Sequence, residues 1–528
     1  MREYVVHQIL DRSIRISPGQ EIISEGNSYT FEKFYSRVIR LAYSLHQHGV
    51  KQGEVIGVLD VNTHRFLELH YALSMLGAII HTINFRLPLQ QLLYTMRHAE
   101  DKWIFFSERF LEEVRPILKE FPNWVIMNDN NEIPKTENIN LLSYENLIEE
   151  GKEIEPPSAS KVSEGDIYSI FYTTGTTGKP KGIRYKHKEI ILGTLQLFHH
   201  LALHKGGARV SSRDVFMPLI PFFHIHAWGM AFFPIYIGAK VVLAGASTPS
   251  MQVRLIKKHN VSWLNMVPTQ LHMLLQEKGF KDVKVLTGGS PFISGLARAA
   301  TQAGIHYSLI YGGSDQLGTA ISVIPENVEL HSKEALEWLR VGMRPIPMVD
   351  VSLRDEMGRE VPRDGKTLGE IWVRSPWLPE GYYKDEEKTK EAYIDGWFKT
   401  GDIGIYYPNG LLYVADRVKD AIKSGGEWIP TGALEALISE HPLVEMVAVI
   451  PMKDKQWGER PLAIIKVKEN SQGLCEKEIK DFLLSKVKEG SLAKFWIPDK
   501  FIFVDTFPIT SAGKLDKKVL RKRYSSDK

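Results

Sequence analysis

The chain has 528 residues, of which 43% are hydrophobic and 24% are charged, and its formal net charge is +3. These values are typical of a globular protein whose length requires two or more domains, and the near balance of charge gives no reason to expect nucleic acid as a partner. The single cysteine, Cys475, excludes an intramolecular disulfide and a cysteine-rich zinc site. It also favours a reducing cytoplasm as the location.

The N-terminal part of the chain alternates between helix and strand patterns. Residues 30–48 predict an amphipathic helix, because Phe34, Val38, Leu41 and Leu45 recur on one face and a glycine follows. Further patterns predict a helix at 71–80 and strands at 55–59, 102–106 and 167–172. This alternation indicates α/β layers around a largely parallel sheet.

The longest apolar stretch, residues 228–246, is interrupted by Pro234, Gly238 and Lys240. A helical membrane span needs about 20 consecutive, predominantly apolar residues. The stretch therefore predicts a buried core segment, and no transmembrane segment is expected.

The most distinctive motif is the glycine-rich segment 171–182, which contains three glycines, four threonines and two lysines at the end of a predicted strand. Glycine lets the backbone approach a ligand closely, while threonine hydroxyls, main-chain N–H groups and lysine can bind phosphate. The spacing does not match the common P-loop, because Gly175 and Gly178 are too close and Pro180 follows Lys179. The segment predicts a phosphate-binding loop of another kind, with a flexible turn as the alternative.

Strand patterns dominate residues 349–414 and predict an antiparallel β subdomain. After a charged break, the chain shows a last α/β pattern with helices predicted at 434–439 and 476–487 and strands at 446–450 and 461–467. We expect an N-terminal domain over 1–416, a hinge over 417–419 and a C-terminal domain over 420–528. A small terminal unit with its own core can move as a body on a few hinge residues.

An ordered series of motifs resembles the acyl-CoA synthetases of the acyl-adenylate-forming (AMP-binding) superfamily, in particular the medium- and long-chain fatty acyl-CoA ligases. The resemblance runs from about residue 25 to the C-terminus, through motifs at 172–182, 221–229, 288–290, 310–315, 396–402, 416–420, 423–430 and 508–516. It implies a large, multi-layered α/β domain with an antiparallel β subdomain, followed by a small mobile α+β domain.

The resemblance assigns a first set of residues to ATP. The glycine-rich loop would wrap the β- and γ-phosphates through Thr173, Thr174, Gly175, Thr176, Thr177, Gly178 and Lys181. The residues expected beside adenine, ribose or the α-phosphate are Gly288, Gly289, Ser290, Tyr311, Gly312, Ser314, Asp402 and Arg417.

At 311–315 the chain departs from the family pattern Tyr-Gly-x-Thr-Glu, with Ser314 for threonine and Asp315 for glutamate. Both replacements preserve the chemistry, since a hydroxyl remains and a carboxylate suits Mg²⁺. Asp315 and Thr173 are the expected magnesium residues. Because aspartate is one methylene shorter, its metal contact is either direct at a shifted position or through water.

The motif at 221–229 supplies the expected acyl site. By resemblance, His224 lies at the junction of acid and ATP, and Trp228 gates the fatty-acyl tunnel. Val267 and Gly313 are expected to line the same pocket. His226 could contact an ω-substituent of the acid, although an ordinary core histidine is the alternative.

The resemblance places the remaining roles on the C-terminal region. Lys514 matches the adenylation lysine and, with His224 and Thr173, forms the predicted catalytic set; Lys419 matches the hinge. The loop expected to shape the pantetheine tunnel of coenzyme A contains Lys423, Gly425, Gly426, Glu427 and Trp428.

The function implied is ATP-dependent activation of a carboxylic acid through acyl-AMP to acyl-CoA, with release of AMP and pyrophosphate. ATP, Mg²⁺ and coenzyme A are the cofactors implied, and a homodimer is plausible from the relatives. A medium- to long-chain fatty acid is the expected substrate. The alternatives are a short-chain, hydroxylated or aryl acid, delivery of the acyl group to a carrier protein, and a catalytically silent nucleotide-binding protein on the same scaffold.

Overall fold

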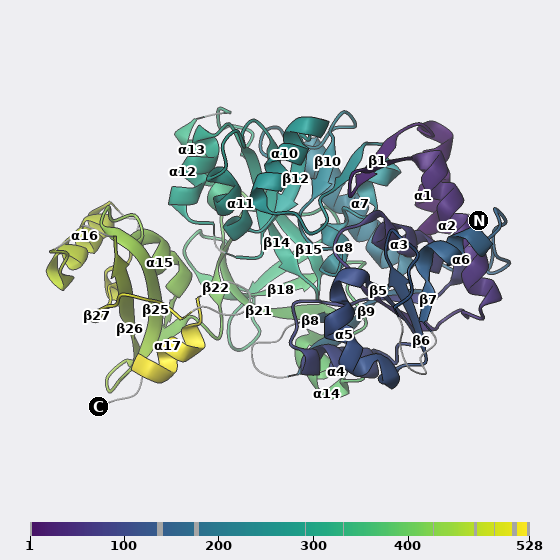
Figure 1. The fold of residues 1–528 in the computed structure, drawn as a ribbon. Helices are drawn as coiled ribbons and strands as arrows, with labels where there is room; N and C mark the ends of the chain where they lie inside the picture. The colour runs from purple at the N-terminus through teal and green to yellow at the C-terminus, as the bar shows by residue number, and fades with distance from the viewer. Residues whose placement is uncertain are drawn as a thin grey trace.

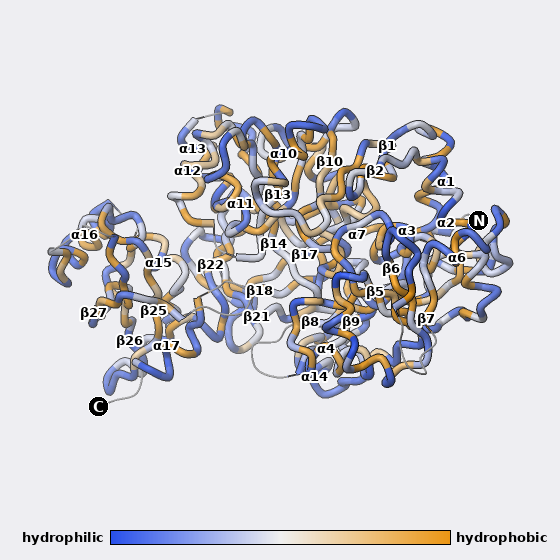
Figure 2. The backbone as a smooth tube through the Cα atoms, viewed as in Figure 1, coloured by the Kyte–Doolittle hydropathy of each residue, from blue (hydrophilic) through white to orange (hydrophobic). Residues whose placement is uncertain are grey.

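The computed structural model describes residues 3–134, 141–173, 179–290, 292–330, 332–425, 427–468, 473–489, 492–508 and 515–524. Figure 1 shows a large body that contains the N-terminus and a smaller unit to one side that contains the C-terminus. Hydrophobic stretches concentrate along the interior strands, and hydrophilic stretches cover the outer loops (Figure 2). The strands form sheets of 14, 8 and 5 strands, which we call sheets A, B and C.

Sheet B is built on five parallel strands in the spatial order β4-β3-β5-β6-β7. Numbered from the first strand in the chain, this is the order 2-1-3-4-5 of flavodoxin-like doubly wound folds. The five strands are β3 (Val55–Leu59), β4 (Ile79–Thr82), β5 (Trp103–Ser107), β6 (Asn123–Met127) and β7 (Leu141–Ser143). Their helices include α2 (Phe31–Gln47), α3 (His64–Leu76), α4 (Leu89–Ala99), α5 (Leu111–Val114) and α6 (Tyr144–Glu150).

Three more strands extend sheet B beyond β4. Strand β8 (Ile167–Thr173) pairs parallel with β4 and antiparallel with β9 (Lys181–Lys186), so the glycine-rich segment connects the two strands of a hairpin. Strand β19 (Tyr382–Tyr383), from far along the chain, pairs with β9. Strands from distant parts of the sequence therefore meet beside the predicted phosphate loop.

Sheet A contains a second set of five parallel strands in the order β11-β10-β12-β13-β14. Numbered in the same way, this order is again 2-1-3-4-5. The strands are β10 (Phe216–Pro218), β11 (Val241–Leu243), β12 (Trp263–Met266), β13 (Lys284–Gly288) and β14 (His306–Gly313). Their helices are α7 (His187–Leu203), α9 (Phe233–Tyr236), α10 (Pro249–His259), α11 (Pro268–Leu275), α12 (Ser294–Gln302) and α13 (Lys333–Val341).

The predicted antiparallel strands are present and continue sheet A beyond β14. They are connected to the parallel part by β16 (Met343–Pro345). This strand pairs on one side with the strand before it in the chain and on the other side, at Met343 and Leu412, with a strand of the antiparallel subdomain. The strands of this part are β15 (Leu317–Ser322), β17 (Asp350–Arg354), β18 (Leu368–Arg374), β20 (Tyr393–Ile394), β21 (Trp397–Tyr406) and β22 (Leu412–Arg417). Helix α14 (Glu386–Ala392) leads into β20. At the opposite edge lie β1 (Glu21–Ser24) and β2 (Asn27–Thr30), preceded by α1 (His7–Ile16).

The small unit has its own sheet and its own apolar cores, which confirms the predicted α+β pattern. Sheet C contains β23 (Ile422–Ser424), β24 (Glu427–Ile429), β25 (Val444–Asp454), β26 (Gly458–Val467) and β27 (Lys500–Phe503). Its helices are α15 (Thr431–Ile438), α16 (Glu476–Lys488) and α17 (Lys517–Tyr524). The fold class predicted from the sequence is therefore confirmed.

Most predicted elements of the N-terminal part are confirmed, and one is wrong. Thr30 caps α2 by accepting a hydrogen bond from the Lys33 N–H, and the predicted apolar face of this helix is buried. The helix predicted at 71–80 instead ends at Leu76, because Gly77 adopts a left-handed conformation (φ 66°) and the chain turns directly into β4. The spacing of the apolar residues alone did not indicate where this helix ends.

The largest apolar core lies between sheets A and B and joins the two halves of the large body. It contains buried rings from both, including Phe34, Tyr71, Tyr168, Phe198 and Trp263. The segment 228–246 contributes to this core, as predicted. Within the described residues, no helix is long and apolar enough to cross a membrane.

Candidate functional site

The described ends of the glycine-rich loop face each other across the β8–β9 hairpin. Thr173 is the last residue of β8 and pairs in register with Lys181, the first residue of β9. The Lys181 ammonium lies 4.1 Å from the centroid of the Tyr382 ring on β19, a cation–π contact that orients it. The predicted phosphate residues Thr174, Gly175, Thr176, Thr177 and Gly178 lie outside the described residues.

A polar cluster forms where the antiparallel strands meet β14. Asp402 and Arg417 are register partners on β21 and β22, and the Arg417 Nε lies 3.1 Å from the Asp402 carboxylate. The Tyr311 hydroxyl donates to the other oxygen of the same carboxylate at 2.7 Å. Burial raises the pKa of Asp402. The structure thus brings together three residues that the sequence assigned to the nucleotide, although their motifs lie up to about a hundred residues apart in the chain.

The segment that follows Tyr311 is held by tyrosines from other elements. Tyr185 donates to the Ser314 carbonyl at 2.7 Å, and Tyr393 donates to the Asp315 carbonyl at 3.0 Å. The Tyr382 hydroxyl hydrogen-bonds the Asp315 carboxyl group, whose pKa is raised by burial. Since Tyr382 also contacts Lys181, it links the predicted metal residue to the phosphate-loop hairpin.

An apolar pocket with about 590 Å³ of empty space, its open mouth included, begins at the same strand. Gly312 and Gly313 of β14 line it, together with Gly289 after β13 and the exposed His224 after β10. Its apolar wall comes from α7, β14, β15 and the segment after His224, through Ile190, Leu197, Ile225, Trp228, Phe232, Ile310 and Leu317. The pocket therefore opens at the carboxyl ends of parallel strands, where ligands of α/β sheets collect.

The segment that carries Trp228 is a short left-handed turn. The four residues of α8 (Ile225–Trp228) have φ values of 48°, 49°, 52° and 56°. Each costs roughly 1–2 kcal/mol for a residue with a Cβ atom. Asn265 of β12 offsets this cost by donating to the Ala227 carbonyl at 2.7 Å, and its oxygen accepts from the Leu219 N–H at 3.1 Å. Such strain concentrates at functional sites.

His226 is a buried residue that also lines the apolar pocket, so its predicted contact with the acid stays a prediction. It is 1% exposed, its Nε2 lies 3.1 Å from the Ser169 hydroxyl, and its ring packs against His70, Tyr168 and Phe232. Burial holds its pKa well below the usual range. The imidazole is therefore a buried, neutral group in the wall of the pocket, beside Ile225 and Trp228.

Other predicted residues lie around the pocket without lining it. Val267 is the N-cap of α11 and packs beside Gly289, which has a positive φ of 80°. Gly288 pairs with Ile310 on β14, and a Cβ atom at Gly288 would lie 2.3 Å from the Ile310 carbonyl oxygen. Ser290 is half-buried in the loop that follows. These residues shape the edge of the sheet on which the pocket opens.

The described residues of the C-terminal predictions lie in the small unit and in the turn that precedes it. Lys419 lies in a turn after β22, in which the Asp420 and Ala421 N–H groups donate to the Arg417 carbonyl. Lys423, Glu427 and Trp428 belong to the β23–β24 hairpin, and Gly425 at its tip has a φ of 60° and packs against Trp457. Gly426 and Lys514 lie outside the described residues.

Sequence reasoning missed three supporting residues, Tyr382, Asn62 and Asn265. Asn62 follows β3 and binds the segment before His224, donating to the Pro218 and Ile220 carbonyls at 3.1 and 2.9 Å. Its oxygen accepts from the N–H of Phe222 at 2.7 Å. A buried polar amide next to a predicted strand was the available signal.

The fold and this site together define an α/β protein with a nucleotide-type polar cluster beside an apolar pocket. Residues 10–383 match the family described as AMP-binding enzyme, and residues 433–514 match the AMP-binding enzyme C-terminal domain. The chain therefore belongs to the AMP-binding enzyme family.

Relatives span nearly the whole chain. It is 33% identical to a long-chain-fatty-acid–CoA ligase of Thermus thermophilus, covering 98% of this chain and 95% of the relative. It is 31% identical to a medium-chain-fatty-acid–CoA ligase of Ectopseudomonas oleovorans, covering 99% and 96%. Its fold matches a crystal structure of an anthranilate CoA ligase in complex with anthranoyl-AMP, with a TM-score of 0.82, 22% identity and coverage of 99% and 97%.

Proposed function

We propose that this protein activates a carboxylic acid with ATP to form an acyl-AMP and then transfers the acyl group to coenzyme A. The observation that carries the proposal is the dual environment of β14. Tyr311 belongs to the polar cluster with Asp402 and Arg417, whereas Gly312 and Gly313 line the apolar pocket. A nucleotide on the polar side and an acid in the pocket would meet at this strand, beside His224.

The chemistry requires positioning more than covalent catalysis. A carboxylate is a poor acyl donor, because its leaving group would be oxide. In the first step a carboxylate oxygen attacks the α-phosphorus of ATP, forming acyl-AMP and releasing pyrophosphate. In the second step the coenzyme A sulfur attacks the acyl carbon and AMP leaves, while the thiol proton passes to solvent. Neither step needs a protein nucleophile, so charge stabilisation and orientation are the protein's tasks.

Named residues would hold the nucleotide. The Asp402 carboxylate can accept from the ribose hydroxyls, and Arg417 can bind ribose or phosphate. Ser314 would contact the α-phosphate, and Tyr311 would lie against the adenine ring together with the loop 288–290. The hairpin end at Thr173 and Lys181 would hold the departing pyrophosphate, with the threonines and glycines of the loop between them.

Mg²⁺ fits the arrangement around Asp315. Its buried carboxyl group has a raised pKa and one hydrogen bond from Tyr382, so a cation nearby would stabilise the ionised form. Across the described residues no set of three or more His, Cys, Asp or Glu side chains converges on a metal position. Asp315 and Thr173 would therefore hold the ion together with phosphate oxygens, and the ion would offset phosphate charge.

The small unit would serve both steps by changing its position. We place the domain boundaries at 1–416 and 420–528, with the hinge at 417–419. The turn at Lys419 supports this, because sheet C begins at Ile422 immediately after it. Lys514 would stabilise charge at the α-phosphate in the first step. The hairpin residues Lys423, Gly425, Gly426, Glu427 and Trp428 would line the pantetheine path in the second.

The acid is proposed to be a medium- to long-chain fatty acid. The apolar wall of the pocket and the buried Trp228 support an aliphatic chain, and both fatty-acid–CoA ligases above span the whole chain. Pyrophosphate exchange across acids of graded length tests this, and the most active length should shift in Trp228→Ala. Highest exchange with short, hydroxylated or aryl acids would contradict the assignment. AMP release without coenzyme A, followed by transfer to a carrier protein, would contradict the acceptor.

The adenylation step has its own test in Lys514→Ala. We expect this variant to lose acyl-AMP formation by about a hundredfold or more, since such electrostatic groups contribute on that scale. Thioester formation from supplied acyl-AMP should be largely retained. Equal loss of both half-reactions would contradict the assigned role.

A cytoplasmic location and a homodimer complete the proposal. The single cysteine supports a reducing compartment, and the dimer rests on the resemblance alone. Light scattering of the purified chain tests the dimer, and a mass of 60.1 kDa would identify a monomer.

A further inference from the structure

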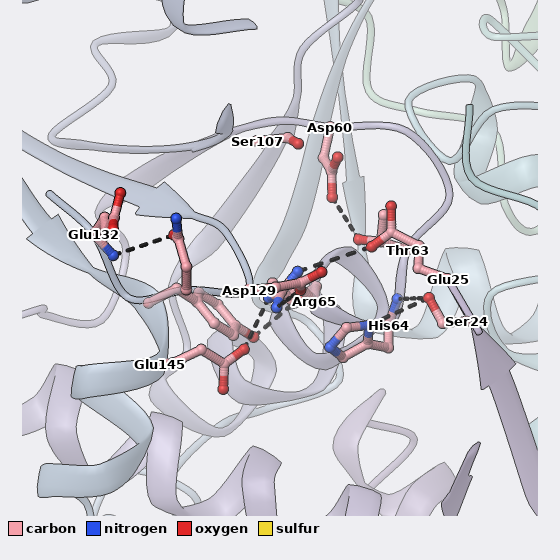
Figure 3. Close-up of polar contacts among 12 residues, drawn as sticks. Ser24, Glu25, Asp60, Thr63, His64, Arg65, Ser107, Asp129, Glu132 and Glu145 are labelled. Atoms are coloured by element: carbon pink, nitrogen blue, oxygen red, sulfur yellow. Dashed lines mark hydrogen bonds and ion pairs between the residues drawn. The ribbon is translucent and has the colours of Figure 1, made fainter. Parts of the chain in front are cut away.

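A second, polar pocket opens in sheet B at the place that corresponds to the candidate active site in sheet A. It contains about 630 Å³ of empty space, its mouth included. Its walls follow the carboxyl ends of three parallel strands, with Asp60 and Thr63 after β3, Ser107 to Arg109 at the end of β5, and Met127 to Asp129 at the end of β6. Figure 3 shows several of these side chains around the helix that begins after Thr63.

The position of this pocket is informative in its own right. In open α/β sheets, ligands bind outside the carboxyl ends of the strands where the strand order reverses. In sheet B the chain runs from β3 to β4 on one side and then to β5 on the other, so the reversal lies between β3 and β5. The pocket lies at that point. In sheet A, residues after β10 and β13 and at the end of β14 line the candidate active site in a similar way.

Two buried polar groups in the wall retain hydrogen-bond acceptor capacity that the described residues do not use. Asp60 is 2% exposed and receives hydrogen bonds from the Val61 N–H and the Thr63 hydroxyl, and it forms no ion pair with a described residue. Burial raises its pKa to about 7. Asn128 is 4% exposed, and its side-chain oxygen has no hydrogen-bond partner among the described residues. Both groups offer acceptors to a ligand that donates.

The charges of the wall determine the kind of ligand. Four carboxylates line the pocket against two guanidinium groups, and Arg65 is already bound by Asp129 at 2.5 Å and by Glu145 at 2.8 Å. Arg109 is paired with Glu25 at 2.7 Å. A phosphate at the N-terminus of α3 would meet the Asp60 carboxylate, and the segment 60–63 has no glycine to admit it. The remaining balance is negative and favours a cation.

The hydrogen-bonding groups of the wall suit an organic cation. Within the described parts of the chain, no three acidic or histidine side chains converge on a position that could hold a metal ion. A buried carboxylate and an amide oxygen match the three N–H donors of a primary ammonium group. We propose that this pocket binds a small organic ammonium compound, with its ammonium group at Asp60 and Asn128 and its polar remainder toward Glu108 and Asp129 at the mouth. This site is separate from the proposed acyl-AMP chemistry.

Calorimetric titration of the full-length protein with 1,4-diaminobutane, 1,5-diaminopentane, ornithine and spermidine tests the proposal. We expect saturable binding of at least one of them, with a rise in the thermal unfolding midpoint that grows with ligand concentration. Asp60→Asn, which keeps the size of the side chain but removes its charge and replaces one acceptor oxygen by an NH2 donor, should weaken binding by about tenfold or more. Phosphate should not displace the bound amine from the wild-type protein.

Variants at the exposed mouth keep the test valid if Asp60→Asn folds poorly. Glu108→Gln and Asp129→Asn should each weaken binding about two- to fivefold through loss of charge, while Glu391→Gln, an exposed carboxylate elsewhere, should leave it unchanged. Absence of saturable binding by all four amines would overturn the proposal. Equal affinity in the wild type, Asp60→Asn and both mouth variants would also overturn it, as would displacement of the bound amine by phosphate.

Discussion

Sheets A and B place five parallel strands in the same order, yet they carry different chemistry at the corresponding edge. At the edge of sheet A, glycines and the left-handed turn leave an apolar pocket next to the Tyr311–Asp402 contact. At the edge of sheet B, buried Asp60 and the carboxylates around Arg65 leave a polar pocket. The strand order supplies a place for a ligand, and the residues after each strand determine which ligand it is.

The difference between sheets A and B is tested most strongly by a glycine-to-alanine substitution in each, which adds one methyl group. In Gly312→Ala a Cβ atom would lie 2.0 Å from the Leu317 carbonyl oxygen, a backbone atom that cannot move away cheaply. We expect a loss of acyl-AMP formation by about a hundredfold or more, since displacement of about 1 Å at a site has effects of this size. Pyrophosphate exchange measures it.

Two matched variants complete this test. Gly313→Ala has open space around the new atom and should retain most activity. In Gly57→Ala, on β3 of sheet B, the new Cβ atom would lie 2.8 Å from both Asp101 Oδ2 and Ile83 Cδ1. This variant should lower the free energy of unfolding while the folded fraction keeps its activity. A Gly57→Ala protein that is fully stable but inactive would break the distinction between the halves.

The next largest effect, on the free energy of unfolding, is expected for substitution of Asn62 or Asn265, which bind the segment around the pocket. Asn265→Ala removes the side-chain hydrogen bonds to the Ala227 carbonyl and from the Leu219 and Ile220 N–H groups, while backbone partners of Ala227 and Leu219 remain. We expect the free energy of unfolding to fall by about 1–2 kcal/mol, because a typical intramolecular hydrogen bond contributes about 0.5–1.5 kcal/mol. Urea unfolding measures this. Asn62→Ala, from the sheet B side, should have a similar effect, and wild-type stability in either variant would show that the turn needs no such support.

A third prediction uses two buried groups, one in each half, whose pKa values are shifted in opposite directions. Burial lowers the pKa of His200 to about 3 and raises that of Asp60 to about 7. The unfolded chain binds the His200 proton more readily, so this group reduces stability as pH falls below about 6.5. Asp60 holds its proton more tightly in the folded state, so its contribution is present at low pH and is lost as pH rises from about 4 to 7.

Urea unfolding between pH 4.5 and 8 measures both contributions. Relative to wild type, His200→Gln should gain stability as pH falls, and Asp60→Asn should gain stability as pH rises. Each difference should change by up to about 1.4 kcal/mol per pH unit within its window. Slopes of the same sign in the two variants would contradict the assignment of one buried neutral base and one buried acid.

The smallest expected effect concerns the link between the halves at Tyr382. Tyr382→Phe keeps the ring beneath Lys181 and removes only the hydroxyl that binds Asp315. We expect the KM for MgATP to rise about threefold to tenfold with little change in kcat, because a typical intramolecular hydrogen bond contributes about 0.5–1.5 kcal/mol. Calorimetric titration with ATP, with and without Mg²⁺, separates binding from turnover. An unchanged KM together with a lower kcat would contradict a positioning role.

Local patterns were sufficient wherever one segment carries its own signal. The apolar face of 30–48, the strand at 55–59 and the elements of the small unit follow from periodicity, because burial of one face depends on spacing alone. The roles of Tyr311 and its neighbours, in contrast, were predicted from the family resemblance at 310–315. The helix predicted at 71–80 failed because the left-handed conformation of Gly77, and not the apolar pattern, ends α3.

The contacts between distant segments could not be predicted from the sequence alone. Nothing local indicates that Tyr382 would lie against Asp315 and Lys181, that Asn62 and Asn265 would hold the turn at 225–228, or that His226 would enter the core beside His70. These positions follow from strand pairing across hundreds of residues and from the packing of sheet A on sheet B. Motifs in the sequence thus named the chemistry, whereas the apposition of the two sheets places the polar cluster and the apolar pocket on the same strand.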